Sequence, residues 1–254
     1  MYVKDKRMRT LTVLAKVSHF FSTFATAYFK MEAIATIHCG FSSKFGIPRQ
    51  SGLAASVTGT IVFKPEYRDP SALRGLEEFS HIWLIWEFSE SVRQQWSPTV
   101  RPPRLGGNTR MGVFATRSPF RPNPIGLSCV KLERIDFNSP DGPVIHISGA
   151  DLMDGTPIFD IKPYIPYTDC QPNATGGFTD RVDMHRLNVT FPENCKVDST
   201  TRQELTEILA EDPRPRYQND PERIYRFDYR GWKVSFKVDS QSNLTVTELT
   251  GSRK

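Results

Sequence analysis

Hydrophobic and polar residues alternate along much of the chain between residues 32 and 148. A period of two is typical of β-strands, because successive side chains point to opposite faces. The run at 81–88, rich in Ile and Trp, predicts a buried central strand. Long stretches with helical period are few, so the pattern favours a mainly β protein built around a β-barrel. The strands predicted in this part lie at residues 32–39, 60–63, 81–88, 111–116, 126–137 and 143–148.

Helix signals are sparse and local. Asp69-Pro70 predicts an N-cap with proline in the first turn, followed by a short helix. Thr201 and Glu204 form a capping-box pattern, which predicts a helix that begins there and has Leu205, Ile208 and Leu209 on one face.

Alternation returns near the C-terminal end, at 225–229 and 232–238 on either side of Arg230-Gly231, which predicts a hairpin with a third strand at 244–249. The predicted core is therefore accompanied by a small α+β C-terminal module. The predicted organisation is an extra N-terminal segment at 1–30, a barrel domain at 31–167, a linker or loop region at 168–200 and a helix-plus-hairpin module at 201–250.

The first 30 residues differ from the rest in charge. They contain six Lys or Arg residues and one Asp, which accounts for the whole net charge of +5, and the remainder is balanced. The basic pI therefore indicates no polyanion-binding domain. We interpret this segment as an upstream extension ahead of Met31, with a transit peptide as the alternative. Its apolar run is interrupted by Lys16 and His19, which argues against export and against a membrane span.

The four cysteines are widely spaced and form no C-x-x-C pair. This spacing argues against a zinc site or a dithiol redox site, and no metal is expected. Reduced cysteines in an intracellular, cytoplasmic protein are the simplest interpretation.

One long stretch is cationic and stiff. Between Glu90 and Glu133 there is no acidic residue, whereas seven residues are basic and six are proline. Arginine, which supplies six of the seven cations, binds phosphate or carboxylate through a planar fork. The stretch is interpreted as an anion-binding site, with a solvated surface loop as the alternative.

A second cluster, at 151–164, places three carboxylates within ten residues and ends in a lysine and a tyrosine. Asp154-Gly155 alone indicates a turn, in which the carboxylate caps backbone N–H groups. The whole string combines anion, cation and hydroxyl groups on a rigid backbone, which favours a functional site.

Together, the strings at 48–50, 99–108, 115–126 and 151–164, with the Asp212-Pro213-Arg214-Pro215-x-Tyr217 signature, resemble the TsaA-like (TrmO) family. The resemblance covers about residues 32–238. It implies a homodimeric β-barrel methyltransferase that uses S-adenosylmethionine. The implied substrate is N6 of threonylcarbamoyladenosine beside the anticodon of tRNA, with threonine tRNA as the expected one. The lack of a Gly-rich fingerprint after a strand also disfavours a Rossmann methyltransferase.

The resemblance also implies roles for individual residues. Asp151 or Asp154 is expected to accept or hold the N6 proton, and the sequence leaves open which one does so. The residues expected to contact the cofactor are Pro48, Arg49, Gln50, Ser89, Glu90, Arg117, Leu127, Gly155, Thr156, Pro157 and Ile158.

Contacts to tRNA are expected from further cations and one aromatic residue, with a surface ion pair as the alternative for each cation. These residues are Arg101, Arg104, Arg110, Arg121, Arg214, Arg216 and Tyr217. Two other functions stay open, a non-catalytic RNA-binding module and a small-molecule methyltransferase. The intact cofactor strings argue against the first and the C-terminal signature against the second.

Overall fold

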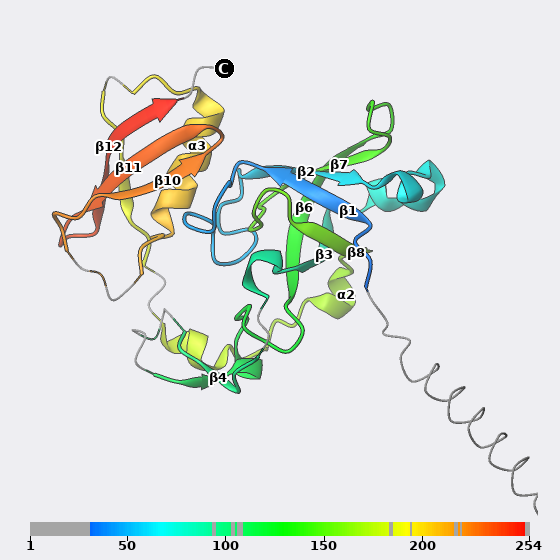
Figure 1. The fold of residues 1–254 in the computed structure, drawn as a ribbon, viewed down its shortest axis with the longest axis horizontal. Coiled ribbons are helices and arrows are strands. Elements are labelled where there is room, and N and C mark those ends of the chain that lie inside the picture. The colour runs from blue at the N-terminus through cyan, green and yellow to red at the C-terminus, as the bar shows by residue number, and fades with distance from the viewer. Residues whose placement is uncertain are drawn as a thin grey trace, which may run out of the picture. The chain divides into compact units, whose positions relative to one another are not determined.

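The structure is a computed structural model, which describes residues 31–92, 95–102, 105, 109–182, 185–193, 195–215, 218 and 220–251 (Figure 1). The predicted extension at 1–30 lies outside the described residues. The strands are β1 (Ala35–Cys39), β2 (Thr58–Phe63), β3 (His81–Glu87), β4 (Thr99–Val100), β5 (Met111–Gly112), β6 (Ile125–Asp136), β7 (Val144–Ser148), β8 (Pro157–Pro163), β9 (Asn188–Thr190), β10 (Tyr225–Tyr229), β11 (Trp232–Val238) and β12 (Asn243–Gly251).

Most helical segments are single 3-10 turns. They are η1 (Pro65–Tyr67), η2 (Pro70–Leu73), η3 (Leu76–Glu78), η4 (Ser89–Ser91), η6 (Val113–Ala115) and η7 (Gly177–Arg181), beside the α-helices α2 (Pro166–Asp169) and α3 (Ser199–Ala210). The predicted mainly β fold is confirmed.

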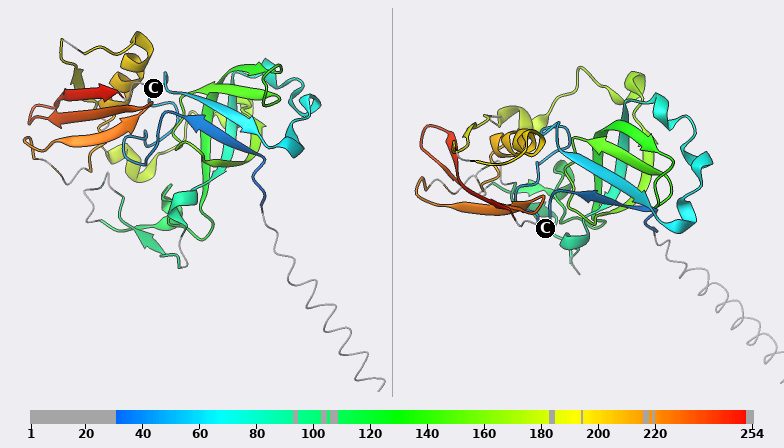
Figure 2. Two further views of the ribbon diagram at one scale, coloured as in Figure 1. Left: turned by 45° about the horizontal axis from the view of Figure 1, so that its top comes forward. Right: turned by 90° about the horizontal axis from the view of Figure 1, so that it is seen from above.

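Six antiparallel strands close into a barrel in the order β1-β2-β7-β6-β3-β8 (Figure 2). The pairing of Ala35 with Ile158 joins β1 to β8 and completes the ring. Closure leaves no exposed strand edge, which is how a small sheet avoids pairing with other chains. The barrel core is confirmed.

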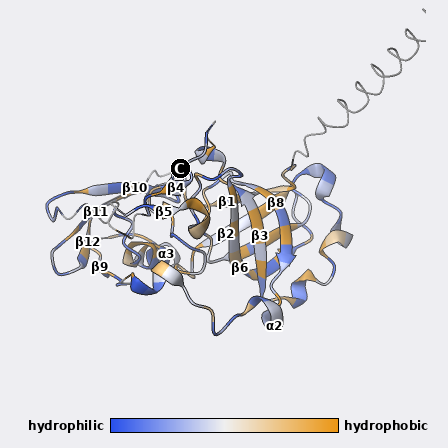
Figure 3. Cartoon of the chain, turned by 90° about the horizontal axis from the view of Figure 1, so that it is seen from below, coloured by the Kyte–Doolittle hydropathy of each residue, from blue (hydrophilic) through white to orange (hydrophobic). Residues whose placement is uncertain are grey.

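Hydrophobic residues recur along the barrel strands (Figure 3). On β3, Ile82, Leu84 and Trp86 are buried, whereas the residues between them are only partly covered. The prediction of a buried strand at 81–88 is confirmed for one face, and the other face is partly covered because it points away from the barrel core.

Two other local predictions are wrong in detail. The strand predicted at 111–116 is limited to β5, and the chain then turns into η6. The C-terminal helix is present but begins earlier than the capping box suggested. Asp198 is the N-cap of α3 and accepts a hydrogen bond from the N–H of Thr201 at 2.9 Å. Glu204 lies within α3, and its side chain is buried.

The C-terminal sheet has the order β10-β11-β12-β9, with β9 parallel to β12. The predicted hairpin and third strand are confirmed. Arg230 and Gly231 have φ angles of 49° and 77° and form the two-residue turn between Tyr229 and Trp232. Positive φ at both positions is the geometry of a type I′ turn, which suits the twist of antiparallel strands.

Buried contacts join this sheet to the barrel. Phe41 forms an isolated β-bridge with Tyr229, and their ring centroids are 4.9 Å apart. The N–H of Arg230 donates to the carbonyl of Gly40 at 2.9 Å. Leu205 and Leu209 of α3 are fully buried and belong to the same hydrophobic core as the barrel residues.

Candidate active site

A chain of polar groups runs from the inside of the barrel to Asp151, just after β7. The indole N–H of Trp86 donates to Ser128 Oγ at 2.9 Å, and the hydroxyl of Ser128 donates to Asp151 Oδ1 at 2.6 Å. Ser128 is fully buried on the inner face of β6. Because the Ser128 hydroxyl receives one hydrogen bond and gives another, it orients the carboxylate of Asp151 as an acceptor.

Burial raises the pKa of Asp151 to about 6, against the smaller lowering effects of its hydrogen bonds from Ser128 and from the backbone N–H of Ser51, and of the nearby charge of Arg117. A carboxylate with a pKa near 6 is ionised at neutral pH and yet basic enough to take up a proton. These are the properties of a general base.

The segment 48–51, called the PRQ loop below, includes Ser51, whose backbone N–H lowers the pKa of this carboxylate. The guanidinium of Arg117 donates to the side-chain oxygen of Gln50, and Ser51 Oγ accepts from the N–H of Cys129 on β6 at 3.1 Å. The structure thus brings Gln50 and Arg117 together and places both near Asp151. Arg117 remains exposed, so its charge is open to a ligand.

Close packing against Gly126 fixes the position of Trp86, the first donor in this series of hydrogen bonds. A Cβ added at Gly126 would lie 2.2 Å from the ring of Trp86. Only glycine leaves room for the indole at this point of β6, which explains a glycine inside a strand.

Asp154 lies in a different environment. Its Oδ1 accepts from the N–H of Cys39 at 3.1 Å and lies 3.3 Å from His38 Nδ1. Its N–H donates to the carbonyl of Phe41 at 2.8 Å. Asp154 therefore caps the turn before β8 and fastens it to β1, and its side chain is exposed to solvent.

The other residues predicted to contact the cofactor differ in exposure. Ser89 and Glu90 are exposed in η4, and the side chain of Lys44 donates to the carbonyl of Glu90 at 2.5 Å. Leu127 is 53% exposed on the outer face of β6. Pro48, Thr156 and Ile158 are buried, Pro157 is partly buried, and the carbonyls of Thr156 and Ile158 accept from the N–H groups of Ile37 and Ile34. Gly155, with a φ of 79°, is exposed, as is Asp154 before it.

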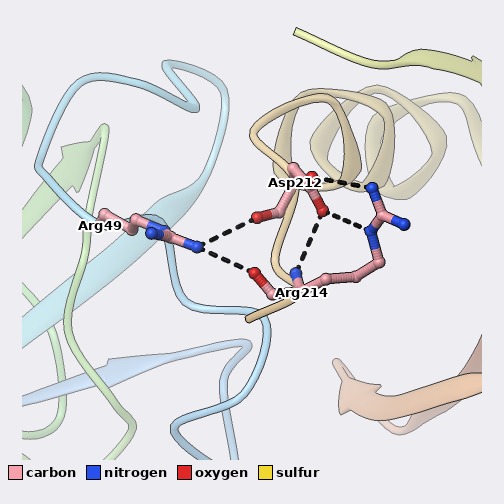
Figure 4. Close-up of polar contacts among 3 residues, drawn as sticks. All are labelled: Arg49, Asp212 and Arg214. Carbon is pink, nitrogen blue, oxygen red and sulfur yellow. Dashed lines mark hydrogen bonds and ion pairs between the residues drawn. The ribbon is translucent and has the colours of Figure 1, made fainter. Parts of the chain in front are cut away.

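Arg49 and Arg214 both form hydrogen bonds within the protein, at the turn that contains Asp212 (Figure 4). Arg49 Nη2 donates to the carbonyl of Arg214 at 3.0 Å and lies 3.5 Å from that of Asp212. Asp212 in turn pairs with Arg214, Oδ1 with Nε at 2.8 Å and Oδ2 with Nη2 at 3.0 Å. Only 11% of the Arg214 side chain is exposed, so it is poorly placed to reach a phosphate.

Among the remaining residues predicted to contact tRNA, Arg101 and Arg110 are exposed and Arg121 is partly buried. Arg110, just before β5, donates to Thr99 Oγ1 of β4 at 2.7 Å, and Arg121 donates to the carbonyl of Thr116 at 3.0 Å. Arg104, Arg216 and Tyr217 lie outside the described residues.

Family models match both parts of the chain. The tRNA-methyltransferase O N-terminal domain matches residues 36–170, and the TrmO C-terminal domain matches residues 184–252. The first match alone spans more than half of the sequence. The chain belongs to the tRNA-methyltransferase O family.

Relatives within this family span most of the sequence. The tRNA (adenine(37)-N6)-methyltransferase of Escherichia coli K12 is 41% identical over 222 residues, covering 82% of this chain and 94% of the relative. The human protein of the same name is 35% identical over 191 residues, which cover 73% of this chain and 42% of that longer protein. A crystal structure of TrmO from Pseudomonas aeruginosa matches with a TM-score of 0.71 and 31% identity, over 87% of this chain and 98% of that one.

Sequence reasoning missed the polar partners of Asp151 in this family member. Ser128 is a polar residue on the buried side of a strand whose other inward residues are Gly126, Val130 and Leu132. A hydroxyl in such a position needs a partner, and that signal was available from the alternation of β6. Ser51 directly follows the PRQ string but has no chemical signature of its own.

The described part of this TrmO-family chain offers neither a cluster of metal ligands nor a membrane-spanning helix. Within it, no group of three or more His, Cys, Asp or Glu side chains is arranged to hold a metal ion. Nor is any helix of that part both long and apolar enough to cross a membrane.

Proposed function

We propose that this protein is an S-adenosylmethionine-dependent methyltransferase that methylates N6 of the adenine at position 37 of tRNA. The observation that carries this proposal is membership of the tRNA-methyltransferase O family across both the barrel and the C-terminal module. Two relatives with this activity in their name align with 82% and 73% of this chain.

We assign the role of proton acceptor to Asp151 in preference to Asp154. The N6–H group must lose a proton as the nitrogen gains a methyl group, and a carboxylate with a pKa of about 6 accepts that proton at neutral pH. Ser128 and the N–H of Ser51 favour the ionised form of the carboxylate and partly offset the effect of burial. Asp154 is already engaged with Cys39 and His38 in a turn.

The residues proposed to contact the cofactor fit S-adenosylmethionine, which supplies an electrophilic methyl group on a sulfonium. Arg117 is an exposed cation beside Gln50 and suits the carboxylate of the cofactor, while the exposed side chain of Leu127 offers an apolar surface. No side chain would crowd a ligand at Gly155, because nothing lies within 4 Å of a Cβ built there. The proposed set is completed by Pro48, Ser89, Glu90 and Pro157. Thr156 and Ile158 hold the adjoining segment through backbone hydrogen bonds from Ile37 and Ile34.

Finer properties are part of the same proposal. The methylated nucleoside is threonylcarbamoyladenosine, in threonine tRNA, and the exposed Arg101 and Arg110 contact its phosphates. Arg104, Arg121, Arg216 and Tyr217 are further proposed contacts. The enzyme acts as a homodimer in the cytoplasm.

A methyl-transfer assay tests the proposal. The full chain is incubated with labelled S-adenosylmethionine and bulk tRNA, and the nucleosides are analysed by mass. We expect label in a methylated threonylcarbamoyladenosine. If label enters plain adenosine, the threonylcarbamoyl requirement is wrong. If no label enters tRNA although the cofactor binds in calorimetry, the substrate is wrong, and if the cofactor does not bind, the methyltransferase proposal fails.

A further inference from the structure

The PRQ loop has partners on two sides. Gln50 accepts a hydrogen bond from Arg117, and Ser51 Oγ accepts from the N–H of Cys129, the neighbour of Ser128 on β6, at 3.1 Å. The backbone N–H of Ser51 also lowers the pKa of Asp151. Arg49, between Pro48 and Gln50, reaches in the other direction and donates to carbonyls of the Asp212–Pro215 turn. These partners are more than 160 residues away along the chain and follow the end of α3.

We propose that the Asp212–Pro215 turn is a positioning element for the methyl-transfer site, which acts by holding Arg49 and thereby the PRQ loop. The proposal rests on the proposed function and deepens it. It assigns to Arg49, Asp212 and Arg214 a role in placing Gln50 and Ser51, in place of direct contact with cofactor or tRNA.

The turn is built to present carbonyl groups. Asp212 adopts a φ of 49°, an uncommon conformation for a residue other than glycine. Its carboxylate receives the backbone N–H of Arg214 at 3.2 Å as well as the guanidinium, so one side chain closes the turn on itself. Pro213 and Pro215 fix their own φ angles and have no N–H to donate. The carbonyls of Asp212 and Arg214 are therefore held in place to accept from Arg49 (Figure 4).

Charge supports the same role. The guanidinium of Arg214 is paired bidentately with Asp212 and largely covered, so it has little capacity left for a phosphate. A bidentate pair is directional and stiff, which suits a residue that maintains a backbone geometry. The turn carries the C-terminal family signature, and its hydrogen bonds to Arg49 connect it directly to the PRQ loop.

A double-mutant cycle tests this inference. S-adenosylmethionine binding to the full chain is measured by calorimetry for Arg49→Met, Asp212→Asn and the double variant. Arg74→Met is the matched control, because Arg74 is an exposed arginine that follows η2. We expect each single change to weaken binding about tenfold, and the double variant to be no weaker than either single one, because residues that act as one unit are not additive. The control should bind as the parent does.

Two further measurements separate positioning from general damage. Arg49→Lys, which can still donate to a carbonyl, should recover part of the affinity that Arg49→Met loses. In methyl transfer, Arg49→Met should also move the lower limb of the kcat–pH profile to higher pH, because a displaced Ser51 N–H no longer favours ionised Asp151. A merely destabilised protein would lose active fraction without that shift.

Several outcomes would overturn the proposal. Unchanged cofactor affinity in Arg49→Met, or a double variant about a hundredfold weaker than the parent, would show that Arg49 and the turn act separately. If Arg214→Met lowers the salt dependence of tRNA binding by about 0.7–0.9 in slope, Arg214 contacts a phosphate directly. If Asp212→Asn does not fold, Arg49→Met and Arg49→Lys decide the question. A parent that binds the cofactor but methylates no tRNA contradicts the proposed function and leaves the cycle interpretable.

Discussion

At the scale of single residues, the chemistry depends on how Asp151 is surrounded. Removal from water favours its neutral form, whereas Ser128, the N–H of Ser51 and the charge of Arg117 favour the ionised form. Desolvation is the largest of these effects, so the pKa rises. The hydrogen bonds and the charge of Arg117 limit the rise to about 6. Asp154, three residues later, lacks this enclosure. Two carboxylates close in sequence thus acquire different properties from their tertiary contacts.

The rate of methyl transfer should therefore depend on the ionisation of Asp151. A general base works in its ionised form, so kcat should fall about tenfold per pH unit below about pH 6 and level off above pH 7. The measurement is kcat for saturating tRNA and cofactor between pH 5 and 8. Asp151→Asn should reduce kcat by about 10²–10⁴ and remove this limb of the profile.

The same substitution should spare the fold. Because the pKa of Asp151 is raised in the folded state, ionisation opposes folding increasingly as pH rises from about 4 to 6. Asn removes that charge and keeps an acceptor for Ser128, so the free energy of unfolding at pH 7 should not decrease. An Asp151→Asn protein with parental kcat, measured beside Asp154→Asn, would contradict the assignment of the base.

At the scale of elements, the β10–β11 turn joins the C-terminal sheet to both α3 and the barrel. The turn directs Arg230 at Glu204, which is fully buried in α3, with Nε–Oε2 at 2.7 Å and Nη2–Oε1 at 2.9 Å. Thr58 of β2 donates its hydroxyl to the same carboxylate at 3.3 Å. Three elements therefore depend on one buried carboxylate for their polar contacts.

Removal of this carboxylate should be costly. Glu204→Ala leaves the Arg230 guanidinium and Thr58 without their acceptor, and loss of one partner in such a buried network costs on the order of 2–3 kcal/mol in the free energy of unfolding. The measurement is denaturant unfolding. Glu222→Ala is the matched control, because Glu222 pairs with Lys237 at 2.9 Å with 85% of its side chain exposed, and it should cost less than about 0.5 kcal/mol. Equal losses in the two variants would contradict a central role for Glu204.

At the scale of the whole molecule, charge is distributed unevenly although residues 31–254 are neutral overall. The acid-free segment after Glu90 concentrates arginines in one part of the barrel domain, where Arg101 and Arg110 are exposed. A local excess of cations attracts a polyanion even when the net charge is zero, and the attraction weakens with salt because counterions are released.

Binding of tRNA should reflect this distribution. If Arg101 and Arg110 each contact a phosphate, replacement of both by Ala should reduce the slope of log K against log salt by about 1.4–1.8. Fluorescence anisotropy with labelled tRNA over a range of salt concentrations gives the slope. The control replaces the exposed Lys64 and Arg74, which lie outside the acid-free segment, and should leave the slope unchanged. Equal slopes in all three proteins would remove Arg101 and Arg110 from the interface.

The sequence by itself determined the type and location of most elements. The hydrophobic pattern placed the barrel strands other than β8, and the C-terminal hairpin, because the side chains of a strand face two different environments. β8, which closes the barrel, lies in the 151–164 string and was not predicted as a strand. It was less reliable where backbone interactions over a few residues decide, as at 111–116, where a strand gives way to η6, and at the start of α3, where Asp198 supplies the cap. The long motif strings were sufficient to suggest the family.

Only the tertiary structure decided what the individual site residues do. The sequence did not distinguish Asp151 from Asp154 as the proton acceptor. It also suggested that Arg49 and Arg214 contact ligands. Burial beside Ser128 distinguishes the first pair, and the contact between the PRQ loop and the Asp212–Pro215 turn occupies the second. These properties depend on desolvation and on partners far away in sequence, and neither is encoded by the spacing of residues along the chain.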